Sequence, residues 1–245
     1  MFSFKSAELF MRLIIVLLVY FITAPLVGYS RAWTADEMGD TTPEQLGFLT
    51  LDPMAHISLW WVFFILWVQI FSAHFIPVGL GKHIPINPNN IQGSWRGLKL
   101  AFAYLSDSIA SIVLGIGSFF ILIVMFGADA LVFLERAVSL EPLSLRTLTL
   151  LRPDLSSMSL ILVWFVVTFA LFNCLVAAFS VISNLFHFVV FYYFEDQISQ
   201  SEYGEMILMF GPLLFLYLMI FFVWSYVTAF VVSMAYILAM LVGMF

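Results

Sequence analysis

The sequence predicts an all-α polytopic membrane protein with five transmembrane helices, the last two unusually long. Hydrophobic residues make up 63% of the 245 positions and charged residues only 10%. Residues 206–245 contain no charged side chain at all. A helix needs about 20 apolar residues to cross the hydrocarbon core, where its backbone satisfies its own hydrogen bonds. The apolar runs are long rather than short and alternating, so we expect one helical transmembrane domain over residues 1–245.

The first predicted span covers about residues 9–29. Its apolar stretch, 13–27, follows Lys5 and Arg12 and resembles a signal peptide, but no cleavage site of small residues comes after it. We therefore expect a retained signal anchor. The second predicted span, about 56–78, begins with Trp60 and Trp61, and indole rings favour the membrane–water boundary.

The third predicted span covers about 100–126, with Gly115 in mid-membrane, where a small residue lets helices approach closely. The fourth and fifth cover about 159–194 and 206–245, and neither contains a charge. As single helices they would be about 54 Å and about 60 Å long, at about 1.5 Å per residue. A hydrocarbon core is only about 30 Å thick.

Two structures account for this excess length. Each run either turns back within the membrane, which would give a sixth span, or forms one tilted helix that extends past the bilayer. We favour the extension, because no polar turn sequence interrupts either run apart from Gly211-Pro212. An apolar helix outside lipid needs cover from another chain or another copy. The excess therefore predicts a multi-subunit assembly.

The loops predict the orientation. Loop 81–99 holds three of the nine basic residues and no acid, so we expect it in the cytoplasm. With alternating spans, loops 31–55 and 128–158 then face outward, and the N-terminus is cytoplasmic. A bacterial inner membrane fits this pattern.

Ionisable side chains within spans are costly and are therefore candidate functional groups. In this topology His74, Asp107 and His187 share the inner third of the bilayer, with Gln69 and Asn184 at similar depth. His74 and His187 could ligate a haem b from two helices. Alternatively, all five residues could line a proton or ion path. In a third interpretation these groups only hydrogen-bond between helices.

Other functional classes are excluded or left without support. A single cysteine, Cys174, rules out an internal disulfide and a cysteine-based zinc site. No Walker motif, zinc-protease motif or histidine box occurs, so we expect neither an enzyme nor a metal site. The net charge of −6 is carried almost wholly by loops, so nucleic-acid binding is not indicated.

The leading prediction is therefore an integral subunit of a multi-protein inner-membrane complex for secretion, transport or energy coupling. Such a subunit contributes helical packing surface, holds no cofactor, and has lipid and other subunits or copies of itself as partners. The alternatives are an oligomeric ion or proton channel or transporter that uses Asp107, and a haem b-binding electron-transfer anchor.

Overall fold

The computed structural model describes residues 2–71, 79–127, 129–138, 148–150 and 152–199, together with 229, 232–233, 236–237 and 239–241. All regular structure in these residues is α-helical, which confirms the predicted all-α class for this part of the chain. The helices are α1 (Phe2–Glu37), α2 (Thr42–Gln45), α3 (Pro53–His56), α4 (Leu59–Phe71), α5 (Arg96–Phe126), α6 (Asp129–Val138) and α8 (Ser157–Ser199).

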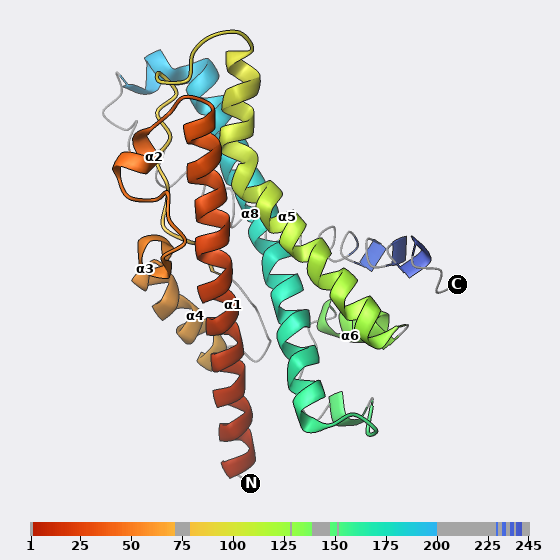
Figure 1. Ribbon diagram of the computed structural model, residues 1–245. Helices are drawn as coiled ribbons and strands as arrows, with labels where there is room; N and C mark the ends of the chain where they lie inside the picture. The colour runs from red at the N-terminus through yellow and green to blue at the C-terminus, as the bar shows by residue number, and fades with distance from the viewer. Residues whose placement is uncertain are drawn as a thin grey trace.

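Three helices form a bundle that is long and apolar enough to cross a membrane. Their apolar segments are Ala7–Glu37 in α1, Arg96–Phe126 in α5 and Ser157–Leu185 in α8. In Figure 1, α1 and α8 run in one direction and α5 runs in the opposite direction. These helices match the first, third and fourth predicted spans and indicate an integral membrane protein.

Local sequence explains where the long helices begin and end. α1 ends because Gly39 has φ +105°, which side chains rarely adopt, and the N–H of Asp40 donates back to the carbonyl of Ala35 at 2.9 Å. At the start of α8, the Ser156 hydroxyl accepts a hydrogen bond from the N–H of Ser159 at 3.2 Å.

α8 continues without a break for 43 residues, because no glycine or proline occurs between 157 and 199. At about 1.5 Å per residue it is about 65 Å long. The run 159–194 is therefore one helix, and the alternative in which it turns back is wrong. The fifth predicted span, 206–245, lies almost entirely outside the described residues and stays a prediction.

The core of the bundle is packed from apolar side chains of α1, α5, α6 and α8. Trp164, Phe119 and Phe133 are among its largest fully buried members. α5 packs most extensively against α8. A Cβ on Gly115 would lie 3.2 Å from the Cys174 sulfur. The prediction that Gly115 permits close helix approach is confirmed at this contact, and Cys174 is a packing residue.

The two ends of the second predicted span lie at the same level of the bundle. Within this span the structure describes α4 over 13 residues, and residues 72–78 lie outside the described part. The N–H of Ser58, just before α4, donates to the Tyr20 hydroxyl at 3.1 Å, and this hydroxyl donates to the carbonyl of Leu80 at 3.0 Å. The N–H of Lys82 also donates to the carbonyl of His56 at 2.7 Å. Residues 58 and 80 therefore lie at the same level of α1, beside Tyr20.

Because the chain turns back, the loops on either side of α4 meet at one end of the bundle. The buried carboxylate of Asp40 accepts hydrogen bonds from the backbone N–H of Asn87 at 2.7 Å and from the Asn90 side chain at 2.8 Å. Loops 31–55 and 81–99 were expected on opposite sides of the membrane. Direct contact between them is incompatible with that assignment.

The same correction applies to loop 128–158, which was expected on the same side as loop 31–55. α6 follows the far end of α5, away from α2, as Figure 1 shows. Arg152, just before α8, pairs there with Asp129 and with Asp154. The N-terminus of α1, α6 and the start of α8 therefore lie towards one end of the bundle, and the end of α1 and the start of α5 lie at the other.

Candidate functional site

A buried ion pair joins α1 to α5. Nη1 of Arg31 lies 2.8 Å from Oδ2 of Asp107, and only 7% and 12% of the two side chains are exposed. The Arg31 guanidinium also donates to Oδ1 of Asn184 on α8 at 2.9 Å and lies over the Tyr104 ring, 5.8 Å from its centroid. One cation therefore connects all three long helices.

The carboxylate of Asp107 receives further donors from its surroundings. The Ser180 hydroxyl donates to Oδ2 at 2.6 Å, and the Asn184 amide donates to Oδ1 at 2.8 Å. The backbone N–H of Ser108 also donates to Oδ1, at 2.7 Å. Both carboxylate oxygens are engaged, so these contacts fix the position of the Asp107 side chain and, through it, that of Arg31.

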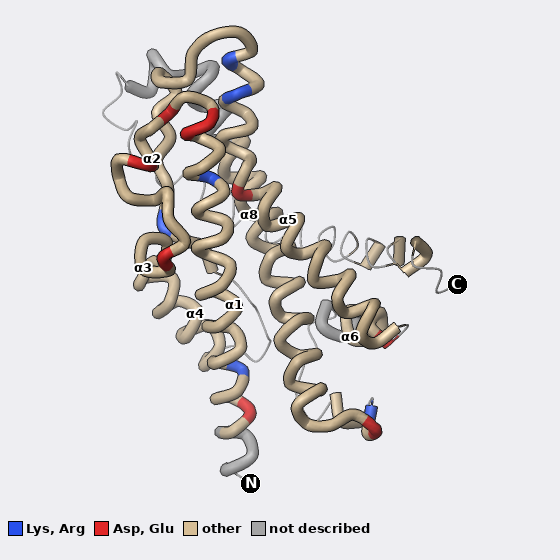
Figure 2. The backbone as a smooth tube through the Cα atoms, viewed as in Figure 1, with Lys and Arg blue, Asp and Glu red and all other residues tan. Residues whose placement is uncertain are grey.

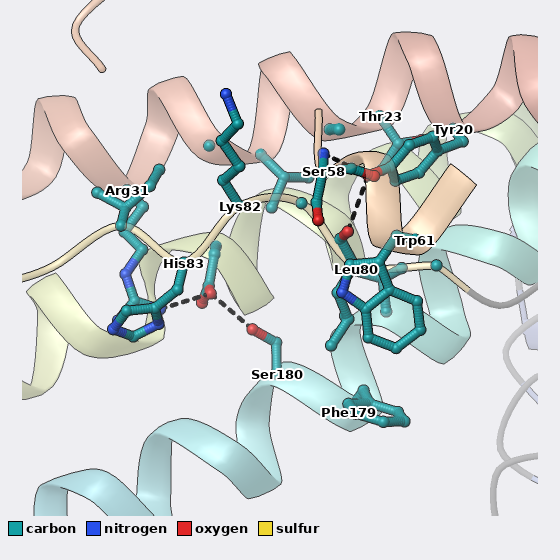
Figure 3. Close-up of a pocket in the computed structure, with 18 of the residues that line it drawn as sticks. Tyr20, Thr23, Arg31, Ser58, Trp61, Leu80, Lys82, His83, Phe179 and Ser180 are labelled. Atoms are coloured by element: carbon teal, nitrogen blue, oxygen red, sulfur yellow. Dashed lines mark hydrogen bonds and ion pairs between the residues drawn. The ribbon is translucent and has the colours of Figure 1, made fainter. Parts of the chain in front are cut away.

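A cavity of about 520 Å³ opens beside this pair, enclosed by α1, α5, α8 and the returning segment 79–84. Figure 3 shows its two ends. Arg31, Lys82 and His83 lie at one end, and Tyr20, Trp61 and Phe179 lie at the other, with Ser180 between them. The cavity therefore has a polar end and an aromatic end.

His56, at the end of α3, packs against Gly28 of α1. A Cβ on Gly28 would lie 2.2 Å from the His56 Nδ1, so only glycine fits there. The His56 Nε2 lies 2.7 Å from the carbonyl of Thr50, which can only accept, so Nε2 carries the proton. The buried Nδ1 has no hydrogen-bond partner in the described part of the chain. Burial lowers the pKa of His56, and this histidine is held neutral.

The structure brings together only two of the five candidate residues. Asp107 and Asn184 share the ion-pair cluster. Gln69 lies elsewhere, since its carbonyl accepts from Arg12, nineteen positions before Arg31 in α1 and so about 28 Å from it. His74 lies outside the described residues. His187 lies in the helix α8, but its side chain is also outside them.

Arg31 is the residue that sequence reasoning missed, because it was assigned to an outer loop. The sequence after it, AWTADE, contains no helix breaker, so α1 continues to Glu37. Ala24, Gly28 and Ala35 recur with Arg31 at helical spacing, and the two alanines are buried. A run of small residues that includes one arginine on a single helix face is the signal that would have found it.

Comparison of the chain with family models, with curated proteins and with solved structures finds no match. Among the residues that the structure describes, no three histidine, cysteine or acidic side chains gather as a metal site would require.

The Arg31–Asp107 pair provides a direct test of its role. We expect Asp107→Asn to destabilise the protein by about 3 to 5 kcal/mol, because it leaves the Arg31 guanidinium buried without a counter-charge. The double variant Arg31→Met/Asp107→Leu should lose much less than the two single changes summed. Unfolding free energies in detergent measure this. Glu37→Gln, an acid-to-amide change at an exposed site of α1, is the control. If the double variant lost as much free energy of unfolding as the two single variants summed, the result would contradict a coupled pair.

His56 predicts a pH dependence. Its pKa in the folded protein lies below the ordinary 6.5, so below about pH 6.5 the unfolded chain takes up a proton that the folded protein does not. The contribution of His56 to the free energy of unfolding is therefore complete above about pH 6.5 and is lost as the pH drops. The nearby Lys82 acts in the same direction and Asp52 in the opposite one. We expect the thermal midpoint to fall between pH 7.5 and pH 5.5 by less in His56→Gln than in the wild type. An equal fall in both would contradict this assignment.

Proposed function

We propose that the protein is an integral subunit of a larger membrane transport assembly, in which one face of the subunit borders a water-filled space. That face is made by residues 46–58 and 79–92 and is called here the non-helical face, since its only helix is the one-turn α3, with turns at 46–47 and 88–90. The observation that supports the proposal is the depth of this face along α1.

The depth follows from the contacts of the non-helical face with α1. Residues 13–30 of α1 carry no charge and are about 27 Å long, close to the thickness of a hydrocarbon core. Figure 2 shows the acidic and basic residues of α1 itself above and below this stretch. Within it, Tyr20 contacts Ser58 and Leu80, and Gly28 contacts His56. The non-helical face thus packs against the part of α1 that is expected inside the membrane.

Backbone of this kind cannot face acyl chains. Irregular segments at membrane depth are tolerated only where protein buries them or where they line a water-filled cavity. The side chains of Asp52 and Lys82 are exposed on this face, and charges facing lipid are costly. An isolated subunit in lipid would leave both requirements unmet, so neighbouring subunits that enclose water best account for the face.

The environment of Asp107 favours this interpretation over a proton path that runs through the carboxylate. A carried proton needs a carboxylate that gives up its partners, whereas Asp107 is held by Arg31, Ser180 and Asn184. The ion pair instead fixes the three helices to which the non-helical face is attached.

The proposal places the N-terminal end of the bundle in the cytoplasm of a bacterial cell. By sequence, the N-terminal segment and the connection between α5 and α8 together hold five of the nine basic residues. They are Lys5, Arg12, Arg136, Arg146 and Arg152. The connection between α1 and α5, with the first turn of α5, holds three. An excess of basic residues marks the cytoplasmic side.

Cysteine labelling tests whether water reaches the non-helical face at membrane depth. In a Cys174→Ala background, we expect Lys82→Cys to react with a membrane-impermeant maleimide in native membranes. Ile22→Cys is the matched control, because Ile22 lies about 3 Å along α1 from Ala24, beside the returning chain, and is 41% exposed on its surface. It should stay unlabelled. Equal labelling at both sites would show that this level lies outside the bilayer.

Particle mass tests the assembly. After extraction in a mild detergent, we expect the protein to elute in a particle heavier than one 27.9 kDa chain, as measured by light scattering with the detergent mass subtracted. A stable, monodisperse monomer that keeps its helix content would contradict the proposal.

A further inference from the structure

We propose that the cavity beside Arg31 is a binding site for an anionic amphiphile, a molecule with one phosphate or carboxylate head on an apolar chain. The cavity of about 520 Å³ falls within the range of about 300–1,000 Å³ in which small-molecule sites lie. This site would be a property of a single chain and does not depend on the assembly.

The polar end of the cavity carries a net positive charge. Its charged lining residues are Arg31, Lys82 and Asp107. Asp107 is engaged on both oxygens by Arg31, Ser180 and Asn184, so its charge is already matched within the protein. Lys82 is exposed and donates to the carbonyl of Met54 at 2.8 Å, which leaves two of its three donors for a ligand.

Arg31 supplies the second observation. Only 6% of this residue is exposed, and its Nε is buried without a hydrogen-bond partner among the described residues. A buried guanidinium donor without an acceptor is costly. Arg31 lines the cavity, so a small rotation of its side chain towards an anionic oxygen bound there would give this donor an acceptor, and the head group is assigned to this end.

The other end of the cavity is suited to a hydrocarbon chain. It is lined by Tyr20, Trp61, Leu80, Phe172 and Phe179. The Tyr20 hydroxyl is already bonded to Ser58 and Leu80, so this end offers mainly ring faces and aliphatic carbon. Figure 3 shows Trp61, Leu80 and Phe179 grouped away from Arg31 and Lys82. A free phosphate would leave this end empty.

Equilibrium binding tests the site. Radiolabelled dodecyl phosphate is titrated into the protein held in phosphatidylcholine nanodiscs, with protein-free nanodiscs as the blank. We expect a saturable component of one molecule per chain. Inorganic phosphate, which lacks the chain, and dodecyl trimethylammonium, which lacks the anionic head, should compete at least about tenfold more weakly, since each loses one end of the site.

Two lysine variants locate the head group. Lys82→Gln should weaken binding of dodecyl phosphate about fivefold, as expected for one exposed charge contact. Lys99→Gln removes a partly exposed lysine outside the cavity and should leave the affinity unchanged. Lys82 is exposed and Lys99 is partly exposed, so neither variant should affect folding, which helix content verifies.

Three results would overturn the proposal. The first is the absence of a saturable component. The second is equal competition by inorganic phosphate, which would make the site one for free anions, or by the cationic amphiphile, which would remove the charge selectivity. The third is an equal response of the two lysine variants.

Discussion

The Tyr20 hydroxyl is the contact on which the topology depends, because it accepts from the N–H of Ser58 and donates to the carbonyl of Leu80. Backbone groups at membrane depth need partners, since lipid offers none. A segment that enters this region and turns back cannot satisfy all of its own backbone, so it must be bonded to a neighbouring helix. One tyrosine in the middle of α1 provides both a donor and an acceptor for the two arms of the segment. The position of the two polar loops at one end of the bundle follows from this return.

The Arg31–Asp107 pair has a different role, since it acts between helices. Helices in lipid gain little from burying apolar surface against each other, so packing and polar contacts must specify how they associate. Close contact at Gly115 and the ion pair act at separate levels of the α5–α8 interface. The pair also adds α1 through Arg31, which contacts both other helices. The cavity beside the pair is a consequence of packing three helices around polar side chains and a returning chain.

Hydrophobic length predicted α1, α5 and α8 well, because a long apolar run has few alternatives to a helix in lipid, even with Pro25 in α1 and Gly115 in α5. It did not predict that residues 58 and 80 lie side by side, because this depends on their bonds to Tyr20, which lies far away in sequence. For the same reason it placed loops 31–55 and 81–99, which are in contact, on opposite sides. Asp107 and Asn184 were found by the rule that polar groups in spans matter, whereas Arg31 was missed because the end of the first helix was placed too early.

The side on which each loop lies tests this account most directly. Single cysteines replace the exposed residues Gln45, Asn89 and Asp154 in the Cys174→Ala background, and intact cells are treated with an impermeant maleimide before and after permeabilisation. A chain that turns back between residues 58 and 80 predicts that positions 45 and 89 react from the same side and that position 154 reacts from the opposite side. Labelling of positions 45 and 89 from opposite sides would show that the 56–78 region crosses the membrane and would contradict the account.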